Sequence, residues 1–306
     1  MSDWSFHIGS CAMKAFPFYL WSFQIFSTMQ ERPTDFMLWT GDHLYMLKPW
    51  QWKSEDAMKK AYKKQRNSAR IKKYMASRPQ YAIWDDHDYG PNNSGAEFEH
   101  KDMSLRVFRE MWPNQPFANK EGVYFSFSHK DAQFFMTDGR YFKINDTQLL
   151  GKTQLDWLCE ELKHSKASFK FVIMGVQVLC DGGYENFRKY PKEFEYLMHF
   201  ISENKIEGVI FMSGDVHYSE VSKVERANEY PLYDFTYSPL TSFPINYFSE
   251  NKNRIEETKR NVHNFGEVSF SGENGNRTCE LKCLNKRGKL LWSFKINEND
   301  LKYKSK

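Results

Sequence analysis

Long apolar runs are missing from this chain of 306 residues. No stretch approaches the ~20 consecutive apolar residues that a transmembrane helix needs, so we expect no membrane span. Long basic blocks are missing as well, because the net charge of +4 is spread along the sequence. We therefore expect no nucleic-acid-binding module. The five cysteines are odd in number and widely spaced, which argues against a disulfide framework.

The N-terminal residues, Met1-Ser2-Asp3-Trp4-Ser5-Phe6, lack the basic and apolar regions of a signal peptide. Two interpretations stay open: a cytoplasmic protein, or a mature chain whose targeting segment has been removed. Internal repeats, low-complexity tracts and linkers are also missing. We therefore expect a single domain over residues 1–306. No feature of the sequence indicates an oligomeric state.

The composition is that of a globular protein with a large core. Hydrophobic residues make up 41% and charged residues 27% of the chain, which is ordinary for a folded domain. Aromatic residues reach 17%, a high value that favours β-rich packing, an aromatic-lined site, or both.

Strands and helices alternate over the first two-thirds of the chain, and the last third is mostly strand-like. We predict strands at 4–10, 35–40, 81–84, 123–128, 133–137, 169–176, 208–212, 220–226, 232–237, 264–270, 278–284 and 289–296. We predict helices at 18–29, 54–76, 99–111, 152–164 and 191–204. This order predicts an α/β (α+β) fold of two mixed sheets packed face to face, with helices outside.

Polar clusters follow several predicted strands at the point where each strand ends. The buried strand 208–212 runs into Gly214-Asp215-Val216-His217, and an extended backbone would point Asp215 and His217 to the same side. The strand 35–40 runs into Gly41-Asp42, and the strand 81–84 runs into Asp85-Asp86-His87-Asp88. Because functional crevices in open α/β sheets lie beyond the carboxyl ends of strands, we expect these clusters to meet.

The side chains in these clusters are of types that bind metal ions. Burying several carboxylates together is unfavourable unless cations neutralise them, so their convergence predicts more than one ion. Cys11, Tyr45 and His217 favour a transition metal. Asp86 and Asp215 favour a hard cation such as Ca²⁺, Mg²⁺ or Mn²⁺. Asp42 is the carboxylate that we expect to bridge the two ions.

The ordered motifs resemble those of the alkaline phosphatase D (PhoD-like) family, a branch of the calcineurin-like metallophosphoesterases. The residues that carry the resemblance are Gly9-Ser10-Cys11, Gly41-Asp42-x-x-Tyr45, Trp84-Asp85-Asp86-His87-Asp88, Asp138-Gly139-Arg140, Gly151-x-x-Gln154-x-x-Trp157-Leu158, Ser213-Gly214-Asp215-Val216-His217, Asn251-Lys252-Asn253-Arg254 and Asn264-Phe265-Gly266. They span nearly the whole chain. The resemblance implies a four-layer αββα sandwich with a metal centre at its rim.

The resemblance also implies the ligands of two metal ions. Fe³⁺ would be held by Cys11, Asp42, Tyr45 and His217. One or more Ca²⁺ ions, with Mn²⁺, Mg²⁺ or Zn²⁺ as alternatives, would be held by Asp42, Asp86 and Asp215 with an amide from Asn93 or Gln177. Gln177 stands where most of the superfamily has a metal-binding His, and this departure favours a hard ion at the second position.

The activity implied is that of a phosphoric ester hydrolase (alkaline phosphatase or phosphodiesterase) acting on small phosphate mono- or diesters. Two ions about 3.5–4 Å apart can clamp a phosphoryl group and activate a bound water as hydroxide. His87 is the candidate to protonate the leaving group. Arg140 is the candidate phosphate clamp, because its planar fork suits two phosphate oxygens, and Asn93 is a further substrate-binding candidate.

Several structural interpretations stay open beside these roles. Cys11 could be an inert buried thiol and Tyr45 a packing aromatic, and Arg140 could pair with Asp138 instead of binding phosphate. Asp85 is better explained as a supporting or loop-capping group than as a ligand, and for Asp88 both interpretations stay open. Tyr184, Phe187, Arg188, Phe243 and Tyr247 are the residues that we expect to shape the entrance.

Two rival functions also stay open. One is a non-catalytic binding module that metal stabilises, and the other is a hydrolase on the same scaffold specialised for phospholipid or nucleotide phosphodiesters. The family is commonly periplasmic or secreted, which conflicts with the missing signal segment.

Overall fold

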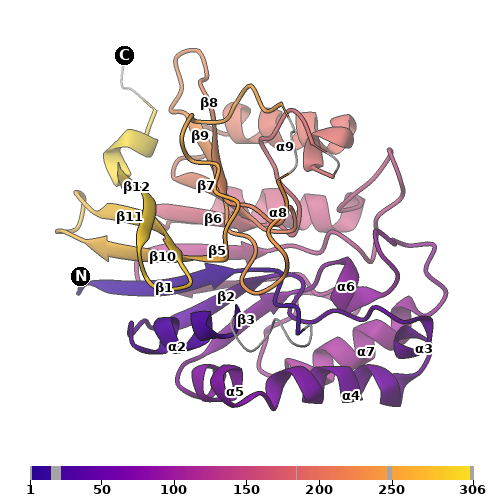
Figure 1. Cartoon of the computed structure of the whole chain (residues 1–306). Helices are drawn as coiled ribbons and strands as arrows, with labels where there is room; N and C mark the ends of the chain where they lie inside the picture. The colour runs from indigo at the N-terminus through magenta and orange to yellow at the C-terminus, as the bar shows by residue number, and fades with distance from the viewer. Residues whose placement is uncertain (1, 15–21, 184, 247–249, 304–306) are drawn as a thin grey trace.

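The structure is a computed structural model that describes residues 2–14, 22–183, 185–246 and 250–303. Two six-stranded sheets lie between helices (Figure 1). The first sheet contains, in spatial order, β12 (Leu290–Asn297), β11 (Thr278–Asn285), β10 (Asn264–Ser271), β1 (Trp4–Gly9), β2 (Phe36–Thr40) and β3 (Gln80–Ile83). The second contains β4 (Phe125–His129), β5 (Ala132–Met136), β6 (Phe169–Ile173), β7 (Val209–Ser213), β9 (Leu232–Thr236) and β8 (Glu220–Val224).

Both sheets are mixed. In the first sheet β1, β2 and β3 are parallel, while β10, β11 and β12 add an antiparallel half. In the second sheet β5, β6, β7 and β9 are parallel, and β4 and β8 are antiparallel partners at its edges. The parallel strands of each sheet therefore end at a common edge, from which their loops can meet.

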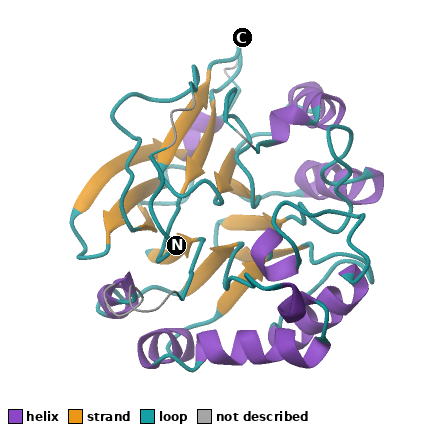
Figure 2. Ribbon diagram, turned by 45° about the vertical axis from the view of Figure 1, so that its right-hand side comes forward, coloured by secondary structure: helices purple, strands orange, loops and turns teal. Residues whose placement is uncertain are grey.

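Most helices lie on the outer faces of the sheets (Figures 1 and 2). The helices are α2 (Gln24–Gln30), α3 (Pro49–Trp52), α4 (Glu55–Arg66), α5 (Ala69–Ala76), α6 (Asp86–Tyr89), α7 (Lys101–Met111), α8 (Lys152–His164) and α9 (Pro191–Glu203), with the 3-10 helices η1 (Phe187–Lys189) and η2 (Glu298–Leu301). Of these, α6 lies at the carboxyl end of β3. Apolar residues of α2, α4, α5 and α7 pack on the first sheet, and those of α8 and α9 pack on the second.

Successive side chains of β2 point alternately into two different cores, which explains why the layers form. Phe36 and Leu38 point into the core between the two sheets, whereas Met37 and Trp39 point into the core beneath the helices. All four are buried, because a strand between two layers needs apolar side chains on both faces. The inner core is largely aromatic: Phe6 stacks on Phe36 with ring centroids 5.2 Å apart.

The predicted α/β sandwich of two mixed sheets is confirmed. The prediction of one helix over 54–76 is wrong, because Asn67 ends α4 and the extended backbone of Ser68 starts α5. The predicted helix 18–29 lies partly outside the described residues, and within them α2 begins at Gln24. Among the described residues, no helix is long and apolar enough to cross a membrane.

Candidate metal centre

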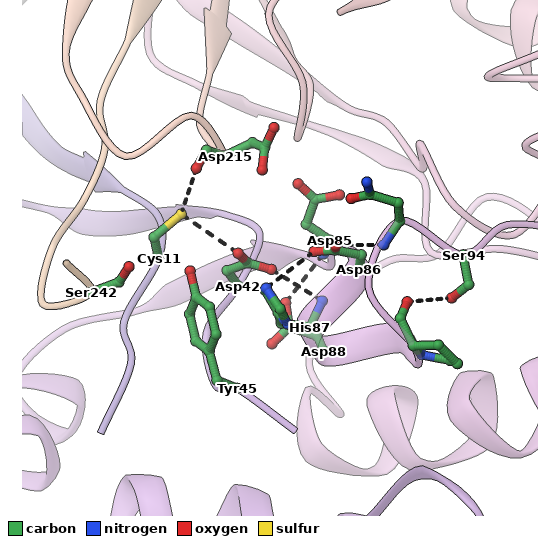
Figure 3. Close-up of polar contacts among 12 residues, drawn as sticks. Cys11, Asp42, Tyr45, Asp85, Asp86, His87, Asp88, Ser94, Asp215 and Ser242 are labelled. Atoms are coloured by element: carbon green, nitrogen blue, oxygen red, sulfur yellow. Dashed lines mark hydrogen bonds and ion pairs between the residues drawn. The ribbon is translucent and has the colours of Figure 1, made fainter. Parts of the chain in front are cut away.

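The predicted metal ligands lie just beyond the carboxyl ends of four parallel strands. Cys11 follows β1, Asp42 follows β2, Asp86 follows β3 at the start of α6, and Asp215 and His217 follow β7. The loops after β1 and β2 are tied together, since the N–H of Ala12 donates to the carbonyl of Asp42 over 2.8 Å. Figure 3 shows Cys11, Asp42 and Tyr45 pointing toward one another.

Left-handed backbone conformations concentrate at this edge. Ten non-glycine residues among those described have positive φ, and five of them are Cys11, Asp42, Asn93, Asp215 and His217. Such conformations each cost about 1–3 kcal/mol and persist where surrounding structure enforces them, typically at functional sites. The expectation of an extended backbone at Asp215 and His217 is therefore wrong, because β7 ends at Ser213 and both residues lie in the turn that follows.

Two glycines allow the ligand loops to approach one another closely. A Cβ added to Gly41, whose φ is +95°, would lie 2.5 Å from the Cβ of Asp85. A Cβ added to Gly214 would lie 2.5 Å from the hydroxyl oxygen of Ser10, on the opposite sheet. Larger residues would push the ligand loops apart, so both glycines are needed for the site to close.

Cys11, Asp42 and His217 form one compact group, in which ligand atoms of all three lie within 4.8 Å of one another. The Cys11 thiol is 3.6 Å from Oδ2 of Asp42, and the Tyr45 hydroxyl is 2.8 Å from Nε2 of His217. The four side chains predicted to hold iron are thus brought together. Burial raises the pKa of the Cys11 thiol and of the Tyr45 hydroxyl well above their usual values, and the Asp42 carboxylate adds to both shifts.

A second group shares Asp42 and adds Asp86 and His87, again with ligand atoms within 4.8 Å. The N–H of His87 donates to Oδ1 of Asp42 over 3.2 Å, and the N–H of Asn93 donates to Oδ2 of Asp86 over 2.7 Å. Oδ1 of Asp86 has no hydrogen-bond partner although it is buried. His87 therefore stands close enough to join this group, a position that the sequence analysis did not assign to it.

Asp215 connects the two groups through different atoms. Its main-chain carbonyl accepts a hydrogen bond from the Cys11 thiol over 3.3 Å, while its carboxylate turns away from Cys11 (Figure 3). Burial raises the pKa of the Asp215 carboxyl well above its usual range, and the nearby charges of Asp85, Glu185 and Asp86 raise it further. The Asp215 carboxylate is thus close enough to the Asp86 carboxylate of the second group to interact with it electrostatically.

The donor set fits divalent or trivalent cations. Burial raises the pKa of Asp42 far above normal, and repulsion from Asp86 and Asp85 increases the shift. Buried oxygens without partners remain on Asp85 and Asp86. Clustered carboxylates of this kind are stable only when a positive charge neutralises them. A thiol, a phenol and an imidazole suit a transition metal, and carboxylates suit a hard ion.

The sequence analysis expected Arg140 to be a phosphate clamp, but in the structure its guanidinium is occupied by buried carboxylates. Its side chain has 0% exposure and pairs through Nε with Asp85 and through Nη1 with Glu185, 2.9 Å away. Its main-chain N–H donates to Asp138, which also accepts from the Trp84 indole over 2.7 Å. In this structure Arg140 therefore connects the loop that carries Asp85 to the loop that carries Glu185.

A cavity of about 280 Å³ lies next to the two groups. It is lined by Asp42, Asp86, His87, Asn92, Asn93, Gly183, Glu185, Asp215, Val216, His217, Tyr218 and Ile245. Of the predicted entrance residues, Phe243 is 48% exposed and accepts from His217 through its carbonyl, whereas Phe187 is buried. Arg188 packs over the ring of Phe194. Tyr184 and Tyr247 lie outside the described residues.

Sequence reasoning missed several residues at the centre. Glu185 lines the cavity, Lys143 pairs with it, and the Ser238 hydroxyl contacts the Cys11 thiol at 3.2 Å. Glu185 and Lys143 lie in no strand-end motif, and Ser238, although it directly follows the predicted strand 232–237, is not a metal-binding residue type. Gln177, considered as a ligand, donates its amide to Glu220 over 2.7 Å in a buried network.

Two mixed sheets with strand-end ligand loops and outer helices define the calcineurin-like metallophosphoesterase fold. The same architecture occurs in a solved structure of PhoD, with a TM-score of 0.77 and 16% identity over 92% of this chain and 66% of that one. It also occurs in purple acid phosphatase PPD1 from seeds of yellow lupin (Lupinus luteus), with a TM-score of 0.69 and 15% identity. That match covers 98% of this chain and 55% of the lupin chain.

The chain belongs to the PhoD-like phosphatase family, whose model matches residues 6–290. The resemblance read from the strand-end motifs is therefore confirmed. The chain spans about two-thirds of the PhoD structure's length and about half of the lupin enzyme's. A search of curated proteins found no match.

Proposed function

We propose that this protein is a metal-dependent phosphoesterase that hydrolyses phosphate mono- or diesters at the strand-end centre. The observation that carries the proposal is the pair of ligand groups that share Asp42 beside a cavity. Membership of the PhoD-like phosphatase family supports the same activity. The cavity of about 280 Å³ has room for a phosphate group with a small substituent.

We assign the metals by ligand type. Cys11, Asp42, Tyr45 and His217 would hold Fe³⁺, and Asp42, Asp86 and Asp215 would hold Ca²⁺ or another hard ion. The bound ions would supply a nucleophile at neutral pH and neutralise the charge of the phosphoryl oxygens. His87 lies beside Asp86 and could join its ion, but it is also placed to hold a proton at the cavity wall.

The protein's own groups then orient the substrate and manage the proton. We assign His87 to deliver a proton to the leaving oxygen, because it lines the cavity and stacks on the Tyr45 ring with centroids 4.1 Å apart. Asn93, on the cavity wall, is assigned to donate its side-chain amide to a phosphoryl oxygen. Ser238 keeps Cys11 in position through its hydroxyl.

A substrate panel tests the activity. Protein supplied with iron and calcium should hydrolyse p-nitrophenyl phosphate, bis-p-nitrophenyl phosphate, or both, and Asp86→Asn should remove that activity. Asp156→Asn is the matched control, because Asp156 is an exposed carboxylate on the outer helix α8. No turnover of either ester by the metal-loaded protein, with chelation still lowering its melting temperature, would favour the non-catalytic binding module.

The colour of the protein tests the assignment of the metals. A tyrosinate bound to Fe³⁺ absorbs visible light, so the iron-loaded protein should be coloured. Tyr45→Phe should bleach or shift that band, and Tyr218→Phe, a change at the cavity wall outside the ligand groups, should leave it in place. A colourless, fully active enzyme that contains only zinc would refute the iron assignment.

A further inference from the structure

A buried cluster of opposite charges lies directly behind the cavity. Glu185 lines the cavity, whereas Arg140 and Lys143, with which it pairs, do not. The three residues come from different segments: Arg140 and Lys143 from the turn after β5, and Glu185 from the loop after β6. All three are less than one-tenth exposed. Glu185 therefore stands between the cavity and two cations.

The contacts to Glu185 have the form of an oxyanion site. Nη1 and Nη2 of Arg140 donate to Oε1 and Oε2 of Glu185 over 2.9 and 3.2 Å. The Lys143 ammonium donates to Oε1 over 2.6 Å. A guanidinium fork plus an ammonium is also the donor set that binds the oxygens of a phosphate group.

The same donors are tied to the proposed reaction site. Lys143 donates a second hydrogen bond, 2.8 Å long, to the carbonyl of Asn93, whose own N–H binds Asp86. Arg140 pairs through Nε with Asp85, the residue that precedes Asp86. The two cations thus adjoin the second ligand group, and without the Glu185 carboxylate they would have donors left for an anion in the cavity.

We propose that Glu185 is an internal substitute for substrate: its carboxylate occupies the phosphate-binding donors of Arg140 and Lys143, and the phosphoryl group of the substrate displaces it. Lys143 is then a substrate-binding residue, and Glu185 sets the affinity of the site by competing for it. This inference rests on the proposed phosphoesterase function. It also explains why Arg140, although expected to bind phosphate, is enclosed in this structure.

Calorimetric titration of the metal-loaded protein with inorganic phosphate tests the competition. Glu185→Gln keeps the size of the side chain but removes the charge that holds the two cations, so phosphate should bind roughly tenfold more tightly. Asp181→Asn is the control, because it removes the same charge from an exposed position four residues earlier, and it should leave phosphate affinity unchanged.

A double-mutant cycle with Lys143→Met tests the role of Lys143. With Glu185→Gln as background, Lys143→Met should weaken phosphate binding roughly tenfold. In the otherwise unchanged protein the same substitution should have a smaller effect, because it also weakens the hold on the competing carboxylate. Equal effects in both backgrounds would show that Lys143 and Glu185 do not share one site.

A purely structural role for Glu185 predicts that Glu185→Gln will not tighten phosphate binding. If Glu185 only holds Arg140 in place, Glu185→Gln will weaken phosphate binding or leave it unchanged, and either result overturns the inference. If Glu185→Gln does not fold, Glu185→Asp replaces it: the shorter side chain should loosen the pair and tighten phosphate binding to a smaller extent. Absence of ester hydrolysis by the unmodified protein would refute the proposed function, while phosphate titration would still decide the competition.

Discussion

The two sides of the candidate metal centre satisfy their polar atoms in different ways. We call Cys11, Tyr45 and His217 the thiol side, and Asp85, Asp86 and Asp215 the carboxylate side. On the thiol side the groups bond to one another and to neighbours, such as Tyr45 to His217 over 2.8 Å and Ser238 to Cys11 over 3.2 Å. On the carboxylate side, buried oxygens of Asp85 and Asp86 have no partner.

The difference follows from the chemistry of the groups. A thiol and a phenol can donate as well as accept, and a neutral imidazole can do both, so these side chains can form a hydrogen-bonded set without a metal. Ionised carboxylates only accept, so a cluster of them needs cations. Arg140 supplies one positive charge to this side. Burial nevertheless raises the pKa of Asp85 to about 6, although the charge of Arg140 opposes the rise. The carboxylate side therefore depends on bound cations for stability more strongly than the thiol side does.

Asp42 is the residue that both sides share, and its removal should have the largest effect. Asp42→Asn keeps the volume of the side chain but removes the charge that lies in both ligand groups. We expect hydrolysis of p-nitrophenyl phosphate to fall by about 10³-fold or more, with loss of metal on both sides. Rates and elemental analysis on the same sample would check this. Retention of both metals in Asp42→Asn would contradict a shared ligand.

His87 distinguishes proton delivery from metal binding on the carboxylate side. If His87 protonates the leaving group, His87→Gln should slow esters of poor leaving groups by about 10²-fold or more. It should slow p-nitrophenyl esters much less, because p-nitrophenolate leaves without a proton. The measurement is kcat/KM for an alkyl phosphate and for p-nitrophenyl phosphate. An equal loss with both, accompanied by loss of metal, would instead make His87 a ligand.

The layered fold and the main ligand groups could be predicted because they depend on local patterns. Apolar runs that end in polar clusters identified β2, β3 and β7 and placed Asp42, Asp86 and His217 beyond them. Parallel strands then bring such clusters to one edge, whatever the details of the loops.

Features that depend on long-range approach could not be predicted. Glu185 reaches the centre only because the loop after β6 folds against the turn that carries Arg140 and Lys143. The left-handed backbone at Asp215 and His217 is enforced by surrounding structure, such as the 3.0 Å bond from the His217 N–H to Ser238. Periodicity contains neither contact, so the sequence analysis expected an extended backbone there and assigned no role to Glu185.

The stability of the metal-free protein sharpens the comparison between the two sides. Burial raises the pKa of Asp42 and Asp215 well above normal and that of Asp88 to about 8. A carboxyl whose pKa is higher in the folded than in the unfolded state resists ionisation on folding, so its contribution to stability falls as pH rises. The opposing shift of His7, whose burial lowers its pKa to about 4, acts only below about pH 6.5.

We therefore expect chelated protein to melt at a lower temperature at pH 8 than at pH 6.5, by about 3–6 °C. Metal-loaded protein should show a much smaller difference, because the cations hold the carboxylates ionised at both pH values. Asp42→Asn should reduce the pH dependence of the chelated protein, whereas Cys11→Ala, a change on the thiol side, should reduce it less. Differential scanning calorimetry of the four samples checks this, and equal pH dependence with and without metal would contradict a carboxylate side stabilised by cations.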